Sequence, residues 1–241
     1  MCDKGRDTYK IANKEFRMPY KDDTSLIATE IAPYSGEDIA IVVTAQYTTE
    51  EYDALFRYTK ETLKTDQVYH WINNPESFDD FDGLLLRGDK NPNTMGLLDK
   101  LEEYSFKSTW NDFEAKINSG KIKALIVLGP ENHEAYPSLS KKLDLFSQSE
   151  KVLWMSSLHN ELVDQKLKGW QIPMKASVEK SGTFKNFKGI EQHIKPVVTI
   201  MDQALSVDEV VEIFKGSEVS EVASKASQLK TNHFLEERGP L

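Results

Sequence analysis

Cysteine is almost missing from this sequence, because Cys2 is the only one among 241 residues. One cysteine cannot form an internal disulfide, which excludes a disulfide-rich secreted scaffold and favours a reducing compartment. The five histidines are scattered without an i,i+4 pair, so their spacing does not indicate a zinc site. No G-x-S-x-G nucleophile elbow is present either. The pattern therefore contains no self-contained active site.

Long apolar runs and an excess of positive charge are also missing. No run approaches the roughly 18 apolar residues that a membrane span needs, and the N-terminus lacks the apolar core of a signal peptide. Lys and Arg number 30 against 39 Asp and Glu, a net charge of −9, which argues against nonspecific binding to nucleic acid or anionic membranes. We therefore expect a cytoplasmic protein with no nucleic-acid partner and no direct membrane span.

Short apolar runs alternate with amphipathic segments of helical length. The runs predicted as strands cover residues 39–44, 83–86, 122–128 and 152–155. Unbroken apolar strands suit a parallel sheet that is covered on both faces. Helices are expected after Thr48 or Thr49, near 94–104, and over 110–118 and 139–146. This order predicts an α/β fold, a three-layer Rossmann-like domain with a mainly parallel sheet and right-handed crossovers.

Three regions follow from composition along the chain. Residues 1–37 show little periodicity and are expected to form an extended N-terminal segment. Residues 38–205 would form the α/β domain, and within it 178–192 is expected to be a folded-over loop with short strands. Residues 206–241 would form a helical tail that starts at a capping box of Ser206 and Glu209.

Glycine is missing from the turn after the first predicted strand, over residues 44–50. A dinucleotide pyrophosphate needs a close approach of the backbone, which glycines permit. Glu50 and Glu51 at the start of the following helix would also repel an anion. Ordinary NAD binding at this turn is therefore not predicted.

The loop over residues 86–96 is a better candidate for ligand binding. It follows a predicted strand, and α/β proteins bind ligands at the carboxyl ends of their strands. Arg87, Lys90, Asn91 and Asn93 can all donate hydrogen bonds to a phosphate or carboxylate. The same composition is typical of a solvated turn, so both interpretations stay open at this point.

Two further motifs point to a family. The sequence C-D-K-G-R occupies residues 2–6, and E-K-S-G-T-F-K-N occupies 179–186, followed by Gly189 and Gln192. Both resemble motifs of the large iron–sulfur subunit of NADH:quinone oxidoreductase (respiratory complex I) and of the related molybdopterin oxidoreductases. The resemblance extends in the right order from the N-terminus to about residue 200.

The resemblance implies a role for individual residues. Cys2 would be the last ligand of a 4Fe-4S cluster whose other ligands lie outside this chain, and Lys4 would lie between the cluster and a pterin. The residues implied for a vestigial pterin-nucleotide site are Arg87, Asn91, Asn93, Asn186 and Gly189. Where the family has arginine after this glycine, the chain has Ile190, which removes a bidentate phosphate partner. Lys180, Lys185 and Lys188 are nevertheless expected to leave the neighbourhood positive.

The resemblance thus implies a shortened, degenerate molybdopterin-like domain that binds no cofactor by itself. We expect a component of NADH:quinone oxidoreductase that is not catalytic as an isolated chain. Its partners would be the other subunits of the peripheral arm, at the cytoplasmic face of the inner (plasma) membrane. Residues 179–192 are expected to pack on the carboxyl edge of the sheet as structure. Two alternatives are a fragment of a molybdopterin-dependent oxidoreductase of formate dehydrogenase type and a generic small-ligand-binding domain.

Overall fold

The computed structural model describes residues 13–19, 26–72, 89, 91–131, 136 and 138–217. Cys2, Lys4 and Arg87 lie outside these residues, as do the predicted strand over 83–86 and the tail beyond 217. The helices and strands appear in chain order as α2 (Ile27–Ile31), β1 (Ile39–Val43), α3 (Thr49–Tyr58), β2 (Val68–His70), α4 (Thr94–Glu103), α5 (Trp110–Asn118), β3 (Ala124–Leu128), α6 (Leu139–Phe146), β4 (Lys151–Ser156), α7 (Glu161–Lys166), β5 (Gly169–Pro173), β6 (Gly182–Lys185), β7 (Glu191–Ile194) and α8 (Val207–Phe214).

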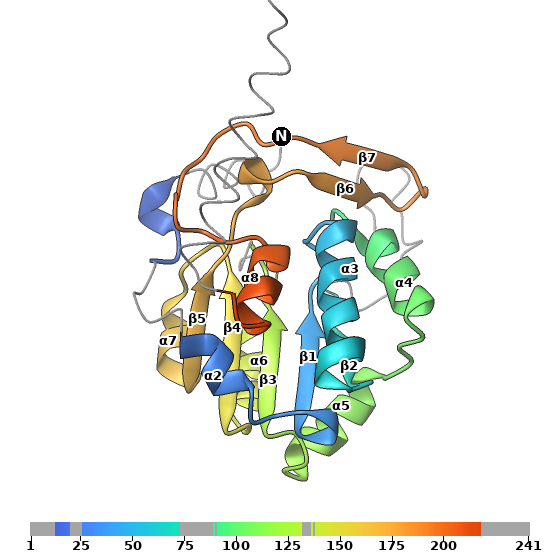
Figure 1. Ribbon diagram of the computed structural model, residues 1–241, viewed down its shortest axis with the longest axis vertical. Helices are drawn as coiled ribbons and strands as arrows, with labels where there is room; N and C mark the ends of the chain where they lie inside the picture. Colours follow the sequence, from blue (N-terminus) through green and yellow to red (C-terminus); the bar gives the residue numbers. More distant parts are fainter. Residues whose placement is uncertain are drawn as a thin grey trace, which may run out of the picture.

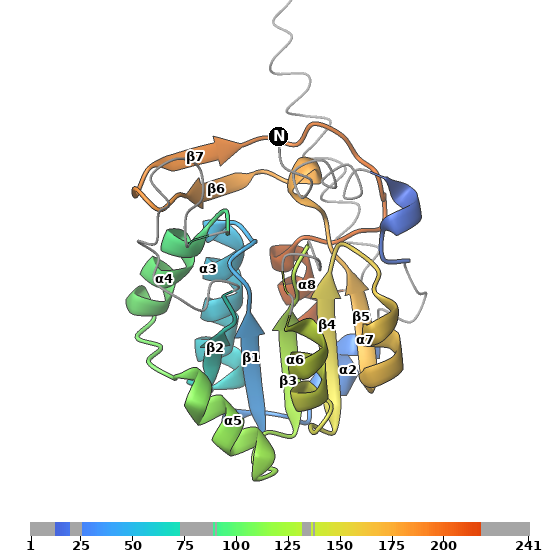
Figure 2. The same ribbon diagram turned by 180° about the vertical axis from the view of Figure 1, so that it is seen from behind.

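The described strands β1 to β5 form one parallel sheet with the order β2-β1-β3-β4-β5. Helices α2, α3, α4 and α8 pack on one face, and α5, α6 and α7 pack on the other (Figures 1 and 2). The predicted three-layer α/β fold is confirmed. Because every strand of this sheet runs in the same direction, all the carboxyl ends lie at one edge.

Strand β1 shows how the sequence produces this layering. Ile39, Ile41 and Val43 belong to the core on the α3 side, whereas Ala40 and Val42 belong to the core on the α5 side. All five side chains are fully buried. A strand covered on both faces needs apolar residues at every position, which is the pattern that identified it in the sequence.

Three of the four predicted strands are confirmed within two residues, as β1, β3 and β4. The sequence did not predict β2 and β5, which are the outermost strands of the described sheet. Their letters are V-Y-H and G-W-Q-I-P, so neither contains an unbroken apolar run. Strand β2 is only three residues long, and the first three residues of β5 are exposed or half-buried, so neither gives the apolar signal of a fully buried strand.

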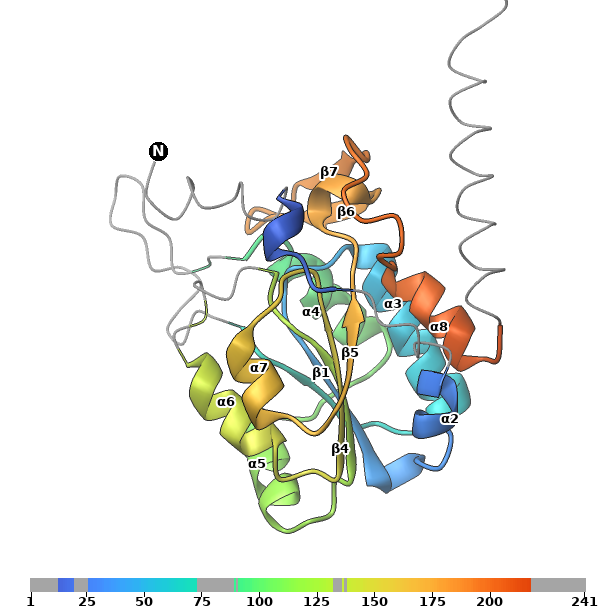
Figure 3. The ribbon, with the colours of Figure 1, turned by 90° about the vertical axis from the view of Figure 1, so that its left-hand side faces the viewer.

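The segment after β5 crosses the carboxyl edge of the sheet. Strands β6 and β7 pair in an antiparallel hairpin, with Gly182 opposite Ile194 and Lys185 opposite Glu191. The hairpin lies over the N-terminal ends of α3 and α4, as Figures 1 and 3 show. The expected loop with short strands is therefore this hairpin, and it packs at the predicted edge.

No helix in the described ranges combines the length and the apolar character needed to cross a membrane.

Candidate functional site

The turn between β1 and α3 occupies the place where a dinucleotide-binding fold holds phosphate. Thr48 caps α3: its Oγ1 accepts a hydrogen bond from Glu51 N at 3.3 Å, and Glu51 Oε2 accepts one from Thr48 N at 2.9 Å. Tyr47 is fully buried beneath this turn, with its hydroxyl 2.9 Å from the Gly129 carbonyl oxygen. The helix N-terminus is thus occupied by side chains of its own first turn.

Strand β6 covers the same helix end from above. Glu50 accepts two hydrogen bonds from Thr183, from its backbone N–H and from its hydroxyl, both at 2.7 Å. Gly182 makes the close approach possible, because a Cβ at this position would lie 2.6 Å from Thr48 Cβ. Its φ of +155° also lies in the region that favours glycine. Two acidic side chains and a strand therefore stand where an anion would bind.

Asn93 joins three elements at this edge. Its Oδ1 accepts a hydrogen bond from Lys185 N at 2.7 Å, and its Nδ2 donates to the Tyr47 carbonyl oxygen at 2.8 Å. Nδ2 also lies 3.3 Å from Thr49 Oγ1, and the side chain is completely buried. The amide that the sequence offered as a ligand donor is used inside the fold, tying the start of α4 to α3 and β6.

Asn91 and Asn186 also make internal hydrogen bonds. The backbone N–H of Asn91 donates to Asp89 Oδ1 at 3.0 Å, and its side-chain Oδ1 accepts from the Tyr136 hydroxyl at 2.9 Å. Asn186 Oδ1 accepts from the backbone N–H groups of Lys188 at 2.9 Å and Ile190 at 3.1 Å. The two hydrogen bonds to Asn186 Oδ1 close the turn between β6 and β7.

Gly189 lies in the same turn with φ at +75°. Its backbone N–H donates to the Asn186 carbonyl oxygen at 2.8 Å. The structure therefore brings Asn186 and Gly189 together, and it places Asn93 against the neighbouring Lys185. Asn91 instead lies beside Tyr136.

The sequence did not identify Glu179 as an anchor. Its Oε2 lies 2.5 Å from Arg17 Nη1, and its Oε1 accepts from the backbone N–H groups of Ile200 at 2.7 Å and Met201 at 2.9 Å. Burial by itself would raise the pKa of this carboxyl, but the backbone donors and the Arg17 charge outweigh it and lower the pKa. Glu179 therefore stays an anion and holds three distant segments together.

Lys180 forms a second buried group with two acids. Its Nζ lies 2.9 Å from Glu51 Oε2 and 3.4 Å from Glu131 Oε1, in ion pairs that are not aligned as hydrogen bonds. Nζ also lies 4.6 Å from the centre of the Tyr47 ring, where a cation–π contact is favourable. Burial alone would lower the pKa of Lys180, but the two carboxylates raise it.

These pairs correct one expectation about charge. Lys180 is buried between Glu51 and Glu131, and Lys185 pairs with Asp99, so neither contributes a free positive charge to the edge. The adjacent letters E-K at 179–180 carried the only sequence signal for this pair of anchors. Their partners lie far away along the chain, and no local pattern indicates them.

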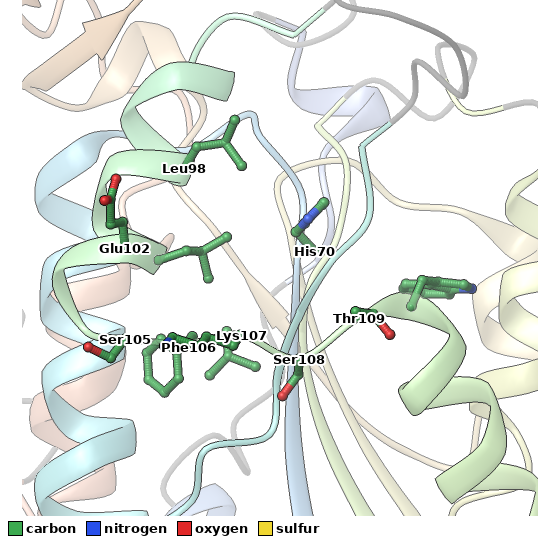
Figure 4. A pocket seen from close by; sticks show the side chains of 11 residues that line it. His70, Leu98, Glu102, Ser105, Phe106, Lys107, Ser108 and Thr109 are labelled. Carbon is green, nitrogen blue, oxygen red and sulfur yellow. The ribbon is translucent and has the colours of Figure 1, made fainter.

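A groove of about 510 Å³ lies elsewhere, along the outer side of β2. Its walls come from α4, the turn after it and the start of α5, and Figure 4 shows Leu98 and His70 on opposite sides. His70 is exposed at the rim of the groove, and partial desolvation there lowers the pKa of its imidazole. The residues that line the groove are Val68, His70, Leu98, Leu101, Glu102, Ser105, Phe106, Lys107, Ser108, Thr109 and Trp110. None of them is a site residue expected from the sequence.

Comparisons with known proteins add no identification. No protein-family model matches the chain, and a search of curated proteins found no similar sequence. Among the residues that the structure describes, no group of three or more His, Cys, Asp or Glu side chains is arranged to hold a metal ion.

Proposed function

We propose that this chain is part of the large iron–sulfur subunit of an NADH:quinone oxidoreductase, in which its α/β domain is architectural. The proposal rests on the contacts that the segment 179–194 makes. This segment resembles the family's pterin-site motif, yet its polar groups are engaged with the chain itself. Glu179 holds Arg17, Lys180 holds Glu51 and Thr183 holds Glu50.

A pterin nucleotide does not fit the residues at this edge. Glu50 and Glu51 stand at the N-terminus of α3, where the nucleotide phosphates would need positive partners. Ile190, at the position of the family's arginine, is 53% exposed and offers no donor from its side chain. Asn93 Oδ1 and Nδ2 both have partners within the fold. We therefore derive no chemistry through a pterin in this domain.

The remaining support comes from the sequence. The motif C-D-K-G-R at residues 2–6 resembles the end of the iron–sulfur domain that precedes the molybdopterin-like domain in this family. In that interpretation Cys2 ligates a 4Fe-4S cluster together with cysteines outside this chain, because a cluster needs about four ligands. The domain would pack against iron–sulfur domains of the peripheral arm while electrons pass through the clusters, in the cytoplasm and beside the membrane.

Cross-linking in the native cells tests this assignment. The chain, carrying an affinity tag at its genomic locus, would be cross-linked briefly, purified from solubilised membranes and analysed by mass spectrometry. We expect cross-linked peptides from the flavin and iron–sulfur subunits of NADH:quinone oxidoreductase, and none from cells with an untagged chain. Molybdenum in about one-to-one ratio, or a formate dehydrogenase-like partner set, would contradict the proposal and favour a molybdopterin enzyme.

A further inference from the structure

Five charged side chains are buried together beneath the hairpin. Arg17, Lys180, Glu51, Glu131 and Glu179 are each no more than 5% exposed. Two are cations and three are carboxylates, so the group has a net charge of −1 if every member is ionised. A buried net charge is costly, because the surroundings cannot replace the water that would solvate it. Taking up one proton from solvent would make the group neutral.

The three carboxylates differ in the hydrogen-bond donors and cations that surround them. Glu179 has Arg17 at 2.5 Å and backbone donors from Ala176, Ile200 and Met201. Glu51 accepts from Thr48 N, pairs with Lys180 at 2.9 Å and lies at the positive end of α3. The partners of Glu179 favour its anion. Glu51 has a backbone donor and a close cation at Oε2, although its Oε1 is buried without an aligned hydrogen bond in the described part of the chain.

Glu131 has fewer and more distant partners for its carboxyl. In the described part of the chain, its carboxyl contacts one cation, Lys180, at the longer distance of 3.4 Å. Its Oε1 is buried without an aligned hydrogen bond there, although the Glu131 backbone N–H donates to Gln46 Oε1 at 2.6 Å. The negative charge is therefore least stable on this side chain.

We propose that Glu131 carries a proton while the β6–β7 hairpin is docked, and that loss of this proton weakens docking. The charged and titratable groups around it are Lys180 before β6, Glu51 and Tyr52 on α3, Tyr47 on the preceding turn, and Arg17 near the start of the described chain. Burial raises the pKa of Glu131 and the Glu51 charge adds to the rise. Lys180 and Arg17 oppose the rise without reversing it.

The coupling to the hairpin runs through Lys180, which lies two residues before Gly182, the first residue of β6. Undocking would withdraw this lysine and admit water, which returns Glu131 to an ordinary carboxyl pKa of about 4.3. The docked state binds the proton more tightly than the undocked state. Docking is therefore strongest below that ordinary pKa and weakens about tenfold per pH unit until the raised pKa is reached.

Amide hydrogen exchange of the hairpin tests this inference. The backbone N–H groups of Thr183 and Lys185 donate to Glu50 and Asn93, so their exchange reports undocking. The matched control is E131Q, because glutamine has the shape and donor ability of a protonated glutamate and does not titrate. At each pH, the opening constant of the wild type is divided by that of E131Q.

We expect this ratio to rise about tenfold per pH unit above an ordinary carboxyl pKa and then to level off. A ratio that is independent of pH between about 4 and 9 would overturn the proposal. E51Q supplies a second measurement, because it removes one competing acid and leaves Lys180 to pair with Glu131 alone. We expect its pH dependence to be much smaller than that of the wild type, and an unchanged dependence would also contradict the proposal.

Infrared spectroscopy covers the case in which a variant does not fold. The folded wild-type protein should keep a protonated-carboxyl C=O stretch above the ordinary carboxyl pKa of about 4.3, and this band should disappear as the pH rises further. Absence of this band in the folded wild type would overturn the assignment without any variant. None of these measurements depends on the partner subunits, so their outcome is separate from the proposed function.

Discussion

Arg17 Nη1 lies 2.5 Å from Glu179 Oε2, and both side chains are almost completely shielded from water. The guanidinium of Arg17 also donates to the carbonyl oxygens of Ser157 at 3.0 Å and Met174 at 2.8 Å. These two residues directly follow β4 and β5. A single side chain thus joins the start of the described chain, the carboxyl ends of two strands and the segment that leads to the hairpin.

Replacing Arg17 should therefore be severely destabilising. R17M would leave Glu179 as a buried anion without its cation, which costs about 3–5 kcal/mol of unfolding free energy. R17K is the matched control, because it keeps the charge but cannot make the three directed contacts of a guanidinium, and an intermediate loss is expected. Urea unfolding measures both values. A loss below about 1 kcal/mol for R17M would show that the pair contributes little.

Glu179 should give the protein an acid-sensitive component of stability. Its pKa is lowered in the folded state, so its contribution is complete above the ordinary carboxyl pKa of about 4.3. The contribution is lost as the pH falls through the lower pKa of the folded state. We expect the difference in unfolding free energy between wild type and E179Q to be constant near neutral pH and to shrink in acid. A difference that grows in acid would contradict this sign.

The two glycines of the hairpin should respond differently to alanine. In G182A the new Cβ would lie 2.6 Å from Thr48 Cβ at a φ of +155°, so we expect about 2–3 kcal/mol of destabilisation and loss of hairpin protection. In G189A the nearest atom is Lys185 Cε at 3.8 Å, which leaves only the backbone strain of about 1 kcal/mol. Thermal unfolding and amide exchange distinguish the two. Equal effects would mean that the contact with Thr48 is not what requires glycine at 182.

Substitution of Asn93 should lower the free energy of unfolding. N93A would leave the buried Tyr47 carbonyl without a donor, at about 1–3 kcal/mol, and the half-buried Lys185 N–H without its acceptor, at a smaller cost. N91A is the comparison, because Asn91 is only partly buried and its loss should cost about 1 kcal/mol or less. Denaturant unfolding of both variants checks the order, and a reversed order would contradict the structural assignment.

The central strands were predictable because burial on both faces leaves an unbroken apolar run in the sequence, as at β1 and β3. The contacts at the carboxyl edge of the sheet were less predictable, because the same type of side chain can bind a ligand or form hydrogen bonds within the fold. Asn93 carries amide donors that suit a phosphate, and the fold uses them for Tyr47 and Lys185. Gly182 belongs to the motif that resembles a pterin-site segment, and the close approach that it permits is to Thr48.

The buried charges could not be derived from local patterns. Arg17, Glu51 and Glu131 lie far from Glu179 and Lys180 along the chain and meet them only in the folded structure. Charged side chains are usually exposed, so the sequence alone favours a solvated interpretation for each of them. Only the fold shows that they form one group.

The chain itself closes the carboxyl edge of the sheet, so the purified protein should bind nucleotide and pterin ligands only weakly. Isothermal calorimetry of the purified chain with a guanine nucleotide, and separately with a pterin analogue, would measure the affinity of this edge. We expect dissociation constants no tighter than about 1 mM, or about 4 kcal/mol of binding free energy. Micromolar binding that disappears when Asn186 and Gly189 are substituted would show that this edge is open and holds a working nucleotide site.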